Sequence, residues 1–366
     1  MSTSTGSPRE TTSNGIVNSL TTGRLPRWAP WVILGASWLV SLGIFTLMAA
    51  ATASELNIVL ALVVGTVLFN IAIYVIARLI EGPRQATNRL VTSLVASAFV
   101  IALLPLISLI FTVIATGLAR FDLAFFSNSM RNVVGEGGGA IHAITGTLLI
   151  TGMATLISVP VGILAAIYLV EYGRGRLSQA ITFFVDVMTG IPSIVAGLFA
   201  YAFFSLIFSD PGIRFGFGGS IALCLLMIPV VVRSSEEMLR IVPNELREAA
   251  YALGVPKWLT ILKVVIPTSI AGIATGVTLS IARVIGETAP LLIIAGFTTS
   301  VNTDLFSDRM MTLPVYVYTQ YANPGVDVDV YLERAWTGAL TLILIVMALN
   351  LIARLIARIF SPKLGR

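Results

Sequence analysis

The chain contains 366 residues, of which 56% are hydrophobic and only 11% are charged; because soluble globular domains carry about 25% charged residues, this composition excludes a surface that faces water throughout and indicates an integral membrane protein. The net charge of +5 does not indicate a nucleic-acid partner, since the basic residues lie between apolar runs and not along one helix face. A single cysteine, Cys224, and a single histidine, His142, exclude an internal disulfide and a metal site rich in cysteine or histidine.

The first 27 residues are rich in Ser, Thr, Gly and Asn, which predicts a disordered tail. The apolar run that follows is too long for the core of a signal peptide and predicts a retained membrane span. Because a spanning helix needs about 20 apolar residues, we expect eight spans, at 28–54, 56–77, 90–119, 137–170, 177–209, 215–232, 264–282 and 335–353. Among these runs only the fifth contains a charge, Asp186, which we expect at the interface or hydrogen-bonded to a neighbouring helix. The predicted fold is an all-α polytopic membrane helix bundle.

The basic residues predict the orientation of these spans. With the N-terminus in the cytoplasm, cytoplasmic segments contain 17 of the 23 Lys and Arg residues and external segments contain five, while Arg283 remains within the membrane. Since cytoplasmic loops of membrane proteins are enriched in Lys and Arg, we expect a multi-pass protein of the plasma membrane with both termini in the cytoplasm.

Two of the external segments are long. The first, 121–139, ends in Gly135-Glu136-Gly137-Gly138-Gly139, which favours a flexible elbow over a phosphate-binding loop, although backbone amides at a helix start can bind anions. The second, 298–334, contains scattered acidic residues, which favour docking to a partner over a Ca²⁺ site because such a site needs closely spaced oxygen ligands. His142 is predicted to lie at the membrane interface.

The cytoplasmic segment 242–256 predicts a short, capped helix. Asn244 is the expected N-cap, Gly254 the expected left-handed closing residue, and Pro256 prevents further helix. One narrow apolar stripe recurs at i, i+3, i+4 and i+7, formed by Leu246, Ala249, Ala250 and Leu253. The stripe alone favours packing on the chain's own bundle or on the membrane surface, but it also fits the groove of a partner protein.

A longer sequence pattern favours docking of this helix to a partner protein over packing on the chain's own bundle. Glu248-Ala249-Ala250, then Gly254 and Val264-Val265-Ile266-Pro267, closely resembles the cytoplasmic loop signature of ABC importer permeases. The resemblance implies that residues 244–254 form the coupling helix, which binds a groove of the ATPase subunit, and that Glu248, Ala249, Ala250 and Gly254 belong to it. No G-x-x-x-x-G-K-[ST] loop occurs in the chain. We therefore expect no enzyme activity, no cofactor and no metal here, and a separate ATPase that binds ATP and Mg²⁺.

Two charges, Arg283 and Glu287, lie within the apolar stretch 264–297. Because an arginine near the bilayer centre costs at least about 2.5 kcal/mol, these charges need a partner or a water-filled path. At i and i+4 of a helix they can pair with each other. A single helix over this stretch would be about 50 Å long, whereas the hydrocarbon core is about 30 Å thick, so we expect Gly286 and Pro290 to break it.

The residues alone leave two roles open for Arg283 and Glu287, a structural ion pair and an anion pathway. A guanidinium group matches the oxygens of phosphate well. Glu287 can accept a hydrogen bond from phosphate, which carries protons near neutral pH, but not from sulfate. This difference predicts a preference for phosphate over sulfate.

The same stretch resembles a narrower family. Ala282-Arg283 followed by Gly286-Glu287-Thr288-Ala289-Pro290-Leu291 is similar to the PstA permease subunits of phosphate importers. Three further segments are similar to the same subunits: Ile144-Thr145-Gly146-Thr147-Leu148, Gly190-Ile191-Pro192-Ser193-Ile194-Val195 and Met311-Thr312-Leu313-Pro314-Val315. The resemblance covers about residues 90–366. It implies a type I ABC importer (MetI-like) permease core, with Arg283 and Glu287 lining the substrate path.

This resemblance also implies partners: a PstC-like second permease, a PstB-like ATPase dimer and an extracytoplasmic phosphate-binding protein, besides membrane lipid. The expected organisation is a tail (1–27), two additional spans (28–80), the first core span with its external loop (90–139), the permease core (140–353) and a basic cytoplasmic tail (354–366). The family core has six spans, so the role of the two additional ones stays open.

The predicted function is ATP-driven import of inorganic phosphate by alternating access. Four alternatives stay open: a permease for molybdate or sulfate, the PstC-type partner, a non-transporting membrane scaffold in phosphate signalling, and a stand-alone secondary carrier. The last of these leaves the coupling-type helix unexplained.

Overall fold

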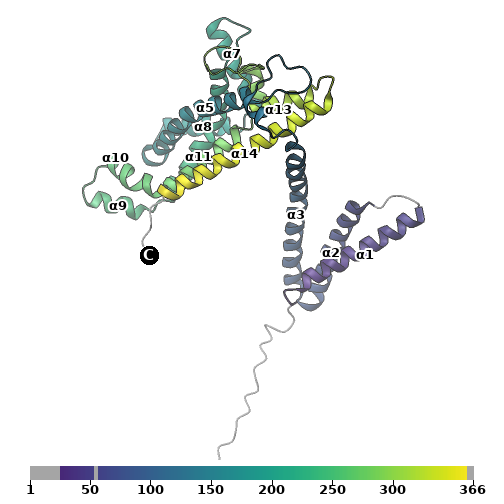
Figure 1. The fold of residues 1–366 in the computed structure, drawn as a ribbon. Coiled ribbons are helices and arrows are strands. Elements are labelled where there is room, and N and C mark those ends of the chain that lie inside the picture. Colours follow the sequence, from purple (N-terminus) through teal and green to yellow (C-terminus); the bar gives the residue numbers. More distant parts are fainter. Residues whose placement is uncertain (1–24, 53–56, 361–366) are drawn as a thin grey trace, which may run out of the picture. The chain divides into compact units, whose positions relative to one another are not determined.

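The computed structural model describes residues 25–52 and 57–360. Most of the expected N-terminal tail, residues 1–24, and the end of the expected basic tail, residues 361–366, lie outside the described residues. The described residues form helices joined by loops, with no strand among them (Figure 1). The chain divides into two units, Met1–Leu109 and Ile110–Arg366, here called the N-terminal and the C-terminal unit.

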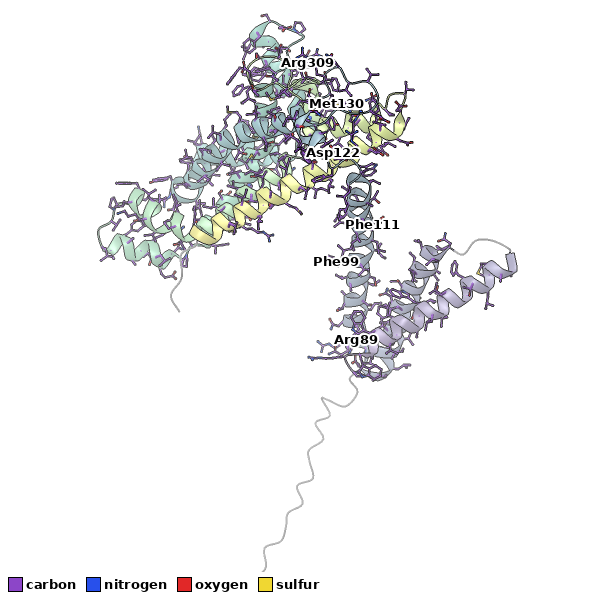
Figure 2. The ribbon with its side chains drawn as sticks, viewed as in Figure 1. Arg89, Phe99, Phe111, Asp122, Met130 and Arg309 are labelled. Carbon is purple, nitrogen blue, oxygen red and sulfur yellow. The ribbon has the colours of Figure 1, made fainter. Side chains whose placement is uncertain are left out.

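The N-terminal unit contains α1 (Ala29–Thr52), α2 (Ile58–Ile80) and the first part of α3 (Pro83–Gly117). Helices α1 and α2 pack closely because Gly65 of α2 has no side chain, which leaves room for the ring of Trp38 of α1. Across the same contact, Ser41 Oγ donates to the carbonyl of Ala61 at 2.6 Å. Figure 2 marks Arg89, Phe99 and Phe111 along α3. Both phenylalanines are exposed, as expected for a helix that faces lipid.

The elements of the C-terminal unit follow in chain order: α4 (Leu123–Ser127), α5 (Ile141–Ile167), the π-helical turn η1 (Tyr168–Tyr172), α6 (Arg176–Thr189), α7 (Ser193–Phe208), α8 (Gly216–Ile241), α9 (Asn244–Ala252), α10 (Lys257–Thr260), the π-helical turn η2 (Ile261–Val265), α11 (Ile266–Val284), α12 (Ala289–Ile294), α13 (Leu313–Ala322) and α14 (Val328–Phe360). Helix α14 therefore continues beyond residue 353, where we expected the basic tail to begin.

Helix α8 is the centre of this unit and packs against α5, α6, α7 and α11 (Figure 1). Small residues allow the close approach: a Cβ added at Gly162 of α5 would lie 2.8 Å from the Cβ of Val231 in α8. Across the same contact, Ser220 Oγ donates to the carbonyl of Ile150 at 3.1 Å. Interfaces of small residues are typical of membrane bundles, in which close packing drives helix association.

In the part of the chain that the structure describes, seven helical segments are long and apolar enough to span a membrane, as expected for a multi-pass membrane protein. The predicted fifth span, 177–209, is not a straight helix: α6 and α7 are bent by 112° at a short break. The break coincides with Pro192, which disfavours helical geometry at Ile191 and cannot donate a backbone hydrogen bond. The eight expected spans are thus seven spans and one bent pair.

The segment 298–334 differs from the expected external loop. It contains α13, in which Leu313, Tyr316 and Gln320 are buried. Helix α14 begins at Val328, so Arg334, expected in an external segment, is the seventh residue of a helix and is fully buried.

Candidate functional site

The predicted coupling helix is present as α9 and lies beside α10 at one end of the unit (Figure 1). Asn244 is not its N-cap, as we had expected. Pro243 takes that position, and Oδ1 of Asn244 accepts a hydrogen bond from Nη1 of Arg247 at 3.2 Å. Gly254 has the expected left-handed conformation, with φ of +75°, and its N–H donates to the carbonyl of Tyr251 at 2.9 Å. The glycine therefore closes the helix.

The apolar stripe of α9 faces away from the rest of this chain. Leu253 is 84% exposed, Leu246 is 41% exposed and Ala249 is exposed, whereas Ala250 is buried. Glu248 is exposed on the same helix. Packing on the chain's own bundle, which the stripe alone favoured, does not account for this exposure. An exposed apolar helix face is suited to the groove of another protein.

Arg247 attaches α9 to the ends of two long helices. Its Nε donates to Oε1 of Glu171 in η1 at 3.0 Å, and both side chains are largely buried. Nη1 donates to the carbonyl of Val242 at 2.6 Å, and Nη2 donates to the carbonyl of Leu239 in α8 at 3.0 Å. This contact could not be predicted from the sequence, because Arg247 and Glu171 are 76 positions apart and no local spacing relates them.

A second contact attaches the following helix to the same turn. Lys257, the first residue of α10, donates from Nζ to the carbonyl of Glu171 and lies 4.7 Å from the ring centroid of Tyr172. The segment from α9 to α10 is thus held at η1 by two cations, one on each side of Gly254.

Arg283 and Glu287 lie at the predicted break of the apolar stretch. Helix α11 ends at Val284, and α12 begins at Ala289. Arg283 is exposed and Glu287 is half-buried. Within the described parts of the chain the two form no ion pair, contrary to one of the two expected roles, because the helix ends before Glu287 reaches its fourth-residue position.

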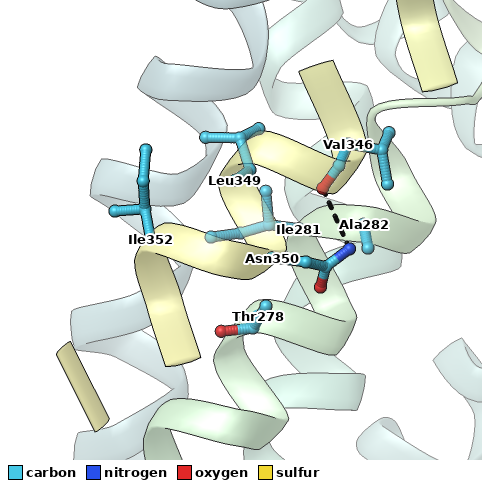
Figure 3. A pocket seen from close by; sticks show the side chains of 7 residues that line it. All are labelled: Thr278, Ile281, Ala282, Val346, Leu349, Asn350 and Ile352. Carbon is cyan, nitrogen blue, oxygen red and sulfur yellow. Dashed lines mark hydrogen bonds between the residues drawn. The ribbon is translucent and has the colours of Figure 1, made fainter. Parts of the chain in front are cut away.

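A small cavity lies between α11 and α14, directly beside this position (Figure 3). Its volume is about 160 Å³, and it is lined by Thr278, Ile281, Ala282, Val346, Leu349, Asn350 and Ile352. Nδ2 of Asn350 donates to the carbonyl of Val346 in its own helix at 3.0 Å. The lining includes no cation, so this cavity itself offers no charge to an oxyanion.

Segments that carried the family resemblance lie at or next to two close contacts between helices. Thr147 Oγ1 accepts a hydrogen bond from the backbone N–H of Leu313 at 2.7 Å, which joins the start of α5 to the start of α13. A Cβ added at Gly197 would lie 2.5 Å from the Cα of Pro290, so α7 and α12 touch through backbone at this glycine. The break that contains Glu287 is therefore supported by α7.

Asp186 bonds a neighbouring helix, in agreement with the prediction for this residue. Its carboxylate pairs with Arg233 of α8, and Arg233 also donates from Nη1 to Oε2 of Glu236 at 2.9 Å. Glu236 is buried and accepts a second bond from Arg240 at 2.7 Å. These four charges connect α6 to α8.

Two arginines bind the carbonyls of the glycine run. Arg334 donates to the carbonyls of Gly135 and Gly137, and Arg120 donates to the carbonyls of Gly137 and Gly138 at 3.4 Å and 3.3 Å. Carbonyls and not amides therefore meet the charged groups, which disagrees with an anion-binding loop. His142 is fully buried against the ring of Tyr316 and does not lie at the interface. No metal-binding cluster of His, Cys, Asp or Glu occurs within residues 25–52 and 57–360.

Comparison with known proteins identifies the family of this chain. Residues 158–366 match the family described as Binding-protein-dependent transport system inner membrane component. The chain is 48% identical over 277 residues to Phosphate transport system permease protein PstA 1 of Mycobacterium tuberculosis (strain ATCC 25618 / H37Rv), which covers 75% of this chain and 88% of that protein. It is 41% identical over 281 residues to the PstA protein of Pasteurella multocida, which covers 76% and 96%.

The fold is similar to that in the crystal structure of a bacterial alginate ABC transporter in complex with an alginate pentasaccharide-bound periplasmic protein. The TM-score is 0.56 at 15% identity, and the match covers 79% of this chain and all of that one. The predicted all-α fold with an ABC importer permease core is thereby confirmed. The chain belongs to the binding-protein-dependent transport system inner membrane component family and, within it, to the PstA-type permeases.

Proposed function

We propose that this chain is the membrane permease subunit of an ATP-driven importer of inorganic phosphate. Its relatives at 41% to 48% identity are named as permease proteins of phosphate transport systems. The observation that carries the proposal in the structure is Arg283, an exposed guanidinium at a helix break in the membrane, without an ion pair in the described chain. Such a charge is costly in a bilayer unless water or an anion meets it.

The proposed partners follow from α9 and from the family. The apolar stripe of α9, a helix that Gly254 closes, supports docking to a separate ATPase subunit of the PstB type. That subunit would bind ATP and Mg²⁺ and hydrolyse the nucleotide. A PstC-like permease would complete the path beside Arg283, and a binding protein would deliver phosphate from outside. In this arrangement both termini are cytoplasmic, as the distribution of Lys and Arg predicts.

The proposed mechanism involves two regions of the chain, the helix α9 and the helix break at Arg283. Motion of the ATPase displaces α9, and the Arg247–Glu171 contact carries this displacement to the end of α5. At the helix break, Arg283 supplies donors to phosphate oxygens, and Glu287 accepts a hydrogen bond from a protonated oxygen. Alternating access then moves the anion past this position.

The test is ATP-dependent phosphate uptake in proteoliposomes that contain this chain, its permease and ATPase partners and the binding protein. Arg283→Ala is compared with wild type and with Arg131→Ala, which removes an exposed arginine outside the helix break. We expect Arg283→Ala to lose uptake while assembly and ATPase binding persist, and Arg131→Ala to retain uptake. Full uptake in the Arg283 variant would assign the translocation path to other residues.

A further inference from the structure

Two helix breaks lie close together in the C-terminal unit. The first, at 190–192, separates α6 from α7, and the second, at 285–288, separates α11 from α12. The proposed mechanism uses only the second. A Cβ added at Gly197 would lie 2.5 Å from the Cα of Pro290, so α7 and α12 touch near their first residues, directly beyond the two breaks.

Helices α7 and α12 also run in the same direction away from these breaks. The ring centroid of Phe204, in the last third of α7, lies 5.0 Å from that of Phe215. The backbone N–H of Phe215 donates at 3.0 Å to the carbonyl of Ile294, the last residue of α12. All three residues belong to one buried cluster. The two helices therefore meet at both ends, which brings the two breaks to a similar level of the bundle.

Ser193, the first residue of α7, lies on the helix face that touches α12. Residues four positions apart share one face of a helix, so Ser193 shares the face of Gly197, which meets Pro290. It lies about 6 Å nearer the first break. On the other chain segment, Glu287 and Thr288 directly precede α12, in which Pro290 is the second residue. Ser193, Glu287 and Thr288 thus gather on the same side of one close contact.

The hydroxyl group of Ser193 has no hydrogen-bond partner among the described residues. Serine and threonine in a helix commonly donate to the carbonyl three or four residues earlier, as Thr189 does to Val185 at 2.8 Å. For Ser193 that position lies across the break. Thr288 also has no partner for its hydroxyl within the described chain. Both residues are half-buried and their hydroxyl oxygens are not sealed from solvent, so each can bind water or a ligand.

The exposure of both breaks indicates water between them. At membrane depth, irregular backbone is tolerated only where protein buries it or where it lines a water-filled cavity. Gly190 and Pro192 at the first break are exposed, and so are Arg283 and Gly286 at the second. One aqueous path along both breaks accounts for this exposure and for a guanidinium group in the membrane.

We infer that the two breaks line one path, and that the hydroxyl group of Ser193 donates a hydrogen bond to phosphate as the anion passes Arg283 and Glu287. A hydroxyl group is both a donor and an acceptor, so it is suited to bare and to protonated phosphate oxygens. Thr288 offers a second hydroxyl group at the same level. This inference rests on the proposed function and adds Ser193 and Thr288 to the residues that bind substrate.

Two variants of similar size test the hydroxyl group. Ser193→Thr keeps it, whereas Ser193→Val replaces it with a methyl group. Phosphate uptake is measured in proteoliposomes that contain the complete importer, with assembly and ATPase binding as checks. We expect Ser193→Val to lower uptake about tenfold, because a hydrogen bond to a charged ligand is lost, and Ser193→Thr to retain most of it. Ser205→Ala removes a buried hydroxyl group without a partner from the same helix and should retain uptake.

A thiol at the same position tests whether phosphate binds there. Ser193→Cys is made in a Cys224→Ala background, which removes the free cysteine of the chain. The assembled complex, in phosphate-free detergent solution, is labelled with a small anionic methanethiosulfonate reagent. We expect labelling, because a thiolate forms where water reaches it, and we expect inorganic phosphate to slow labelling several-fold relative to chloride at equal ionic strength. Val195→Cys, on the opposite face of α7, should label slowly and without protection by phosphate.

The outcomes separate this inference from the proposed function. Wild-type uptake in Ser193→Val, or a thiol in Ser193→Cys that is unreactive or that phosphate does not protect, would overturn the inference. If the wild-type complex imports phosphate in the same experiments, the inference alone fails. A wild-type complex that imports no phosphate, while phosphate still protects the thiol, overturns the proposed transport function and supports the binding site. If Ser193→Val assembles poorly, the thiol measurement decides.

Discussion

Nε of Arg247 in α9 donates to Oε1 of Glu171 at the end of α5, at 3.0 Å, and both side chains are largely buried. The contact joins the exposed helix α9 to the turn η1 that follows α5, a helix long and apolar enough to span a membrane. A buried ion pair that loses one partner leaves an uncompensated charge and typically costs 3–5 kcal/mol. Its loss should therefore affect both the position of α9 and the transfer of motion through it.

Arg247→Ala should reduce the number of phosphate ions imported per ATP hydrolysed, because α9 still binds the ATPase but no longer moves α5. The measurement is the ratio of uptake to ATP hydrolysis in proteoliposomes, with Arg176→Ala as the control for an exposed cytoplasmic arginine. Glu171→Gln keeps an acceptor and should have a smaller effect. An unchanged ratio in Arg247→Ala would show that the contact is structural only.

Leu253→Glu should weaken binding of the ATPase subunit without a change in the stability of this chain. Leu253 is 84% exposed, and substitutions at exposed positions usually change stability by less than about 0.5 kcal/mol. A charge on the apolar stripe, in contrast, would be desolvated in a partner's groove. Co-purification of the ATPase checks the effect. Val326→Glu, at an exposed aliphatic residue between α13 and α14, is the matched control and should retain the ATPase.

Glu287→Gln should reduce the preference for phosphate over sulfate. The carboxylate accepts a hydrogen bond only from an oxyanion that carries a proton, and the amide can donate to either anion. Competition of sulfate with labelled phosphate during uptake measures the preference. If the variant discriminates as well as the wild type does, Glu287 is not the group that selects phosphate.

Gly197→Ala should destabilise the protein by about 1–3 kcal/mol, the usual cost of an added group in a packed interior. The new Cβ would lie 2.5 Å from the Cα of Pro290, so the backbone of α12 must shift. Gly152→Ala is the control, because nothing lies within 4 Å of its added Cβ. Thermal unfolding of the two variants in nanodiscs should separate them. Equal melting temperatures would contradict the contact between α7 and α12.

The sequence by itself determined the features that depend on composition and local chemistry. Runs of about 20 apolar residues predicted the spans because lipid requires them, and Gly286 and Pro290 predicted the break that separates α11 from α12. The spacing of Glu248, Ala249, Ala250 and Gly254 predicted the exposed helix and its family. Each of these features can be read within one short segment.

Only the tertiary structure decided which distant residues meet. Arg247 and Glu171 pair across 76 positions, and His142 is buried beside Tyr316 instead of lying at the interface. The pairing of Arg283 with Glu287, one of the two roles that the residues left open, is not formed within residues 25–52 and 57–360, because the helix ends between them. Hydropathy reports the cost of burying one residue in lipid, whereas the partner of a buried charge depends on how helices far apart in the chain pack together.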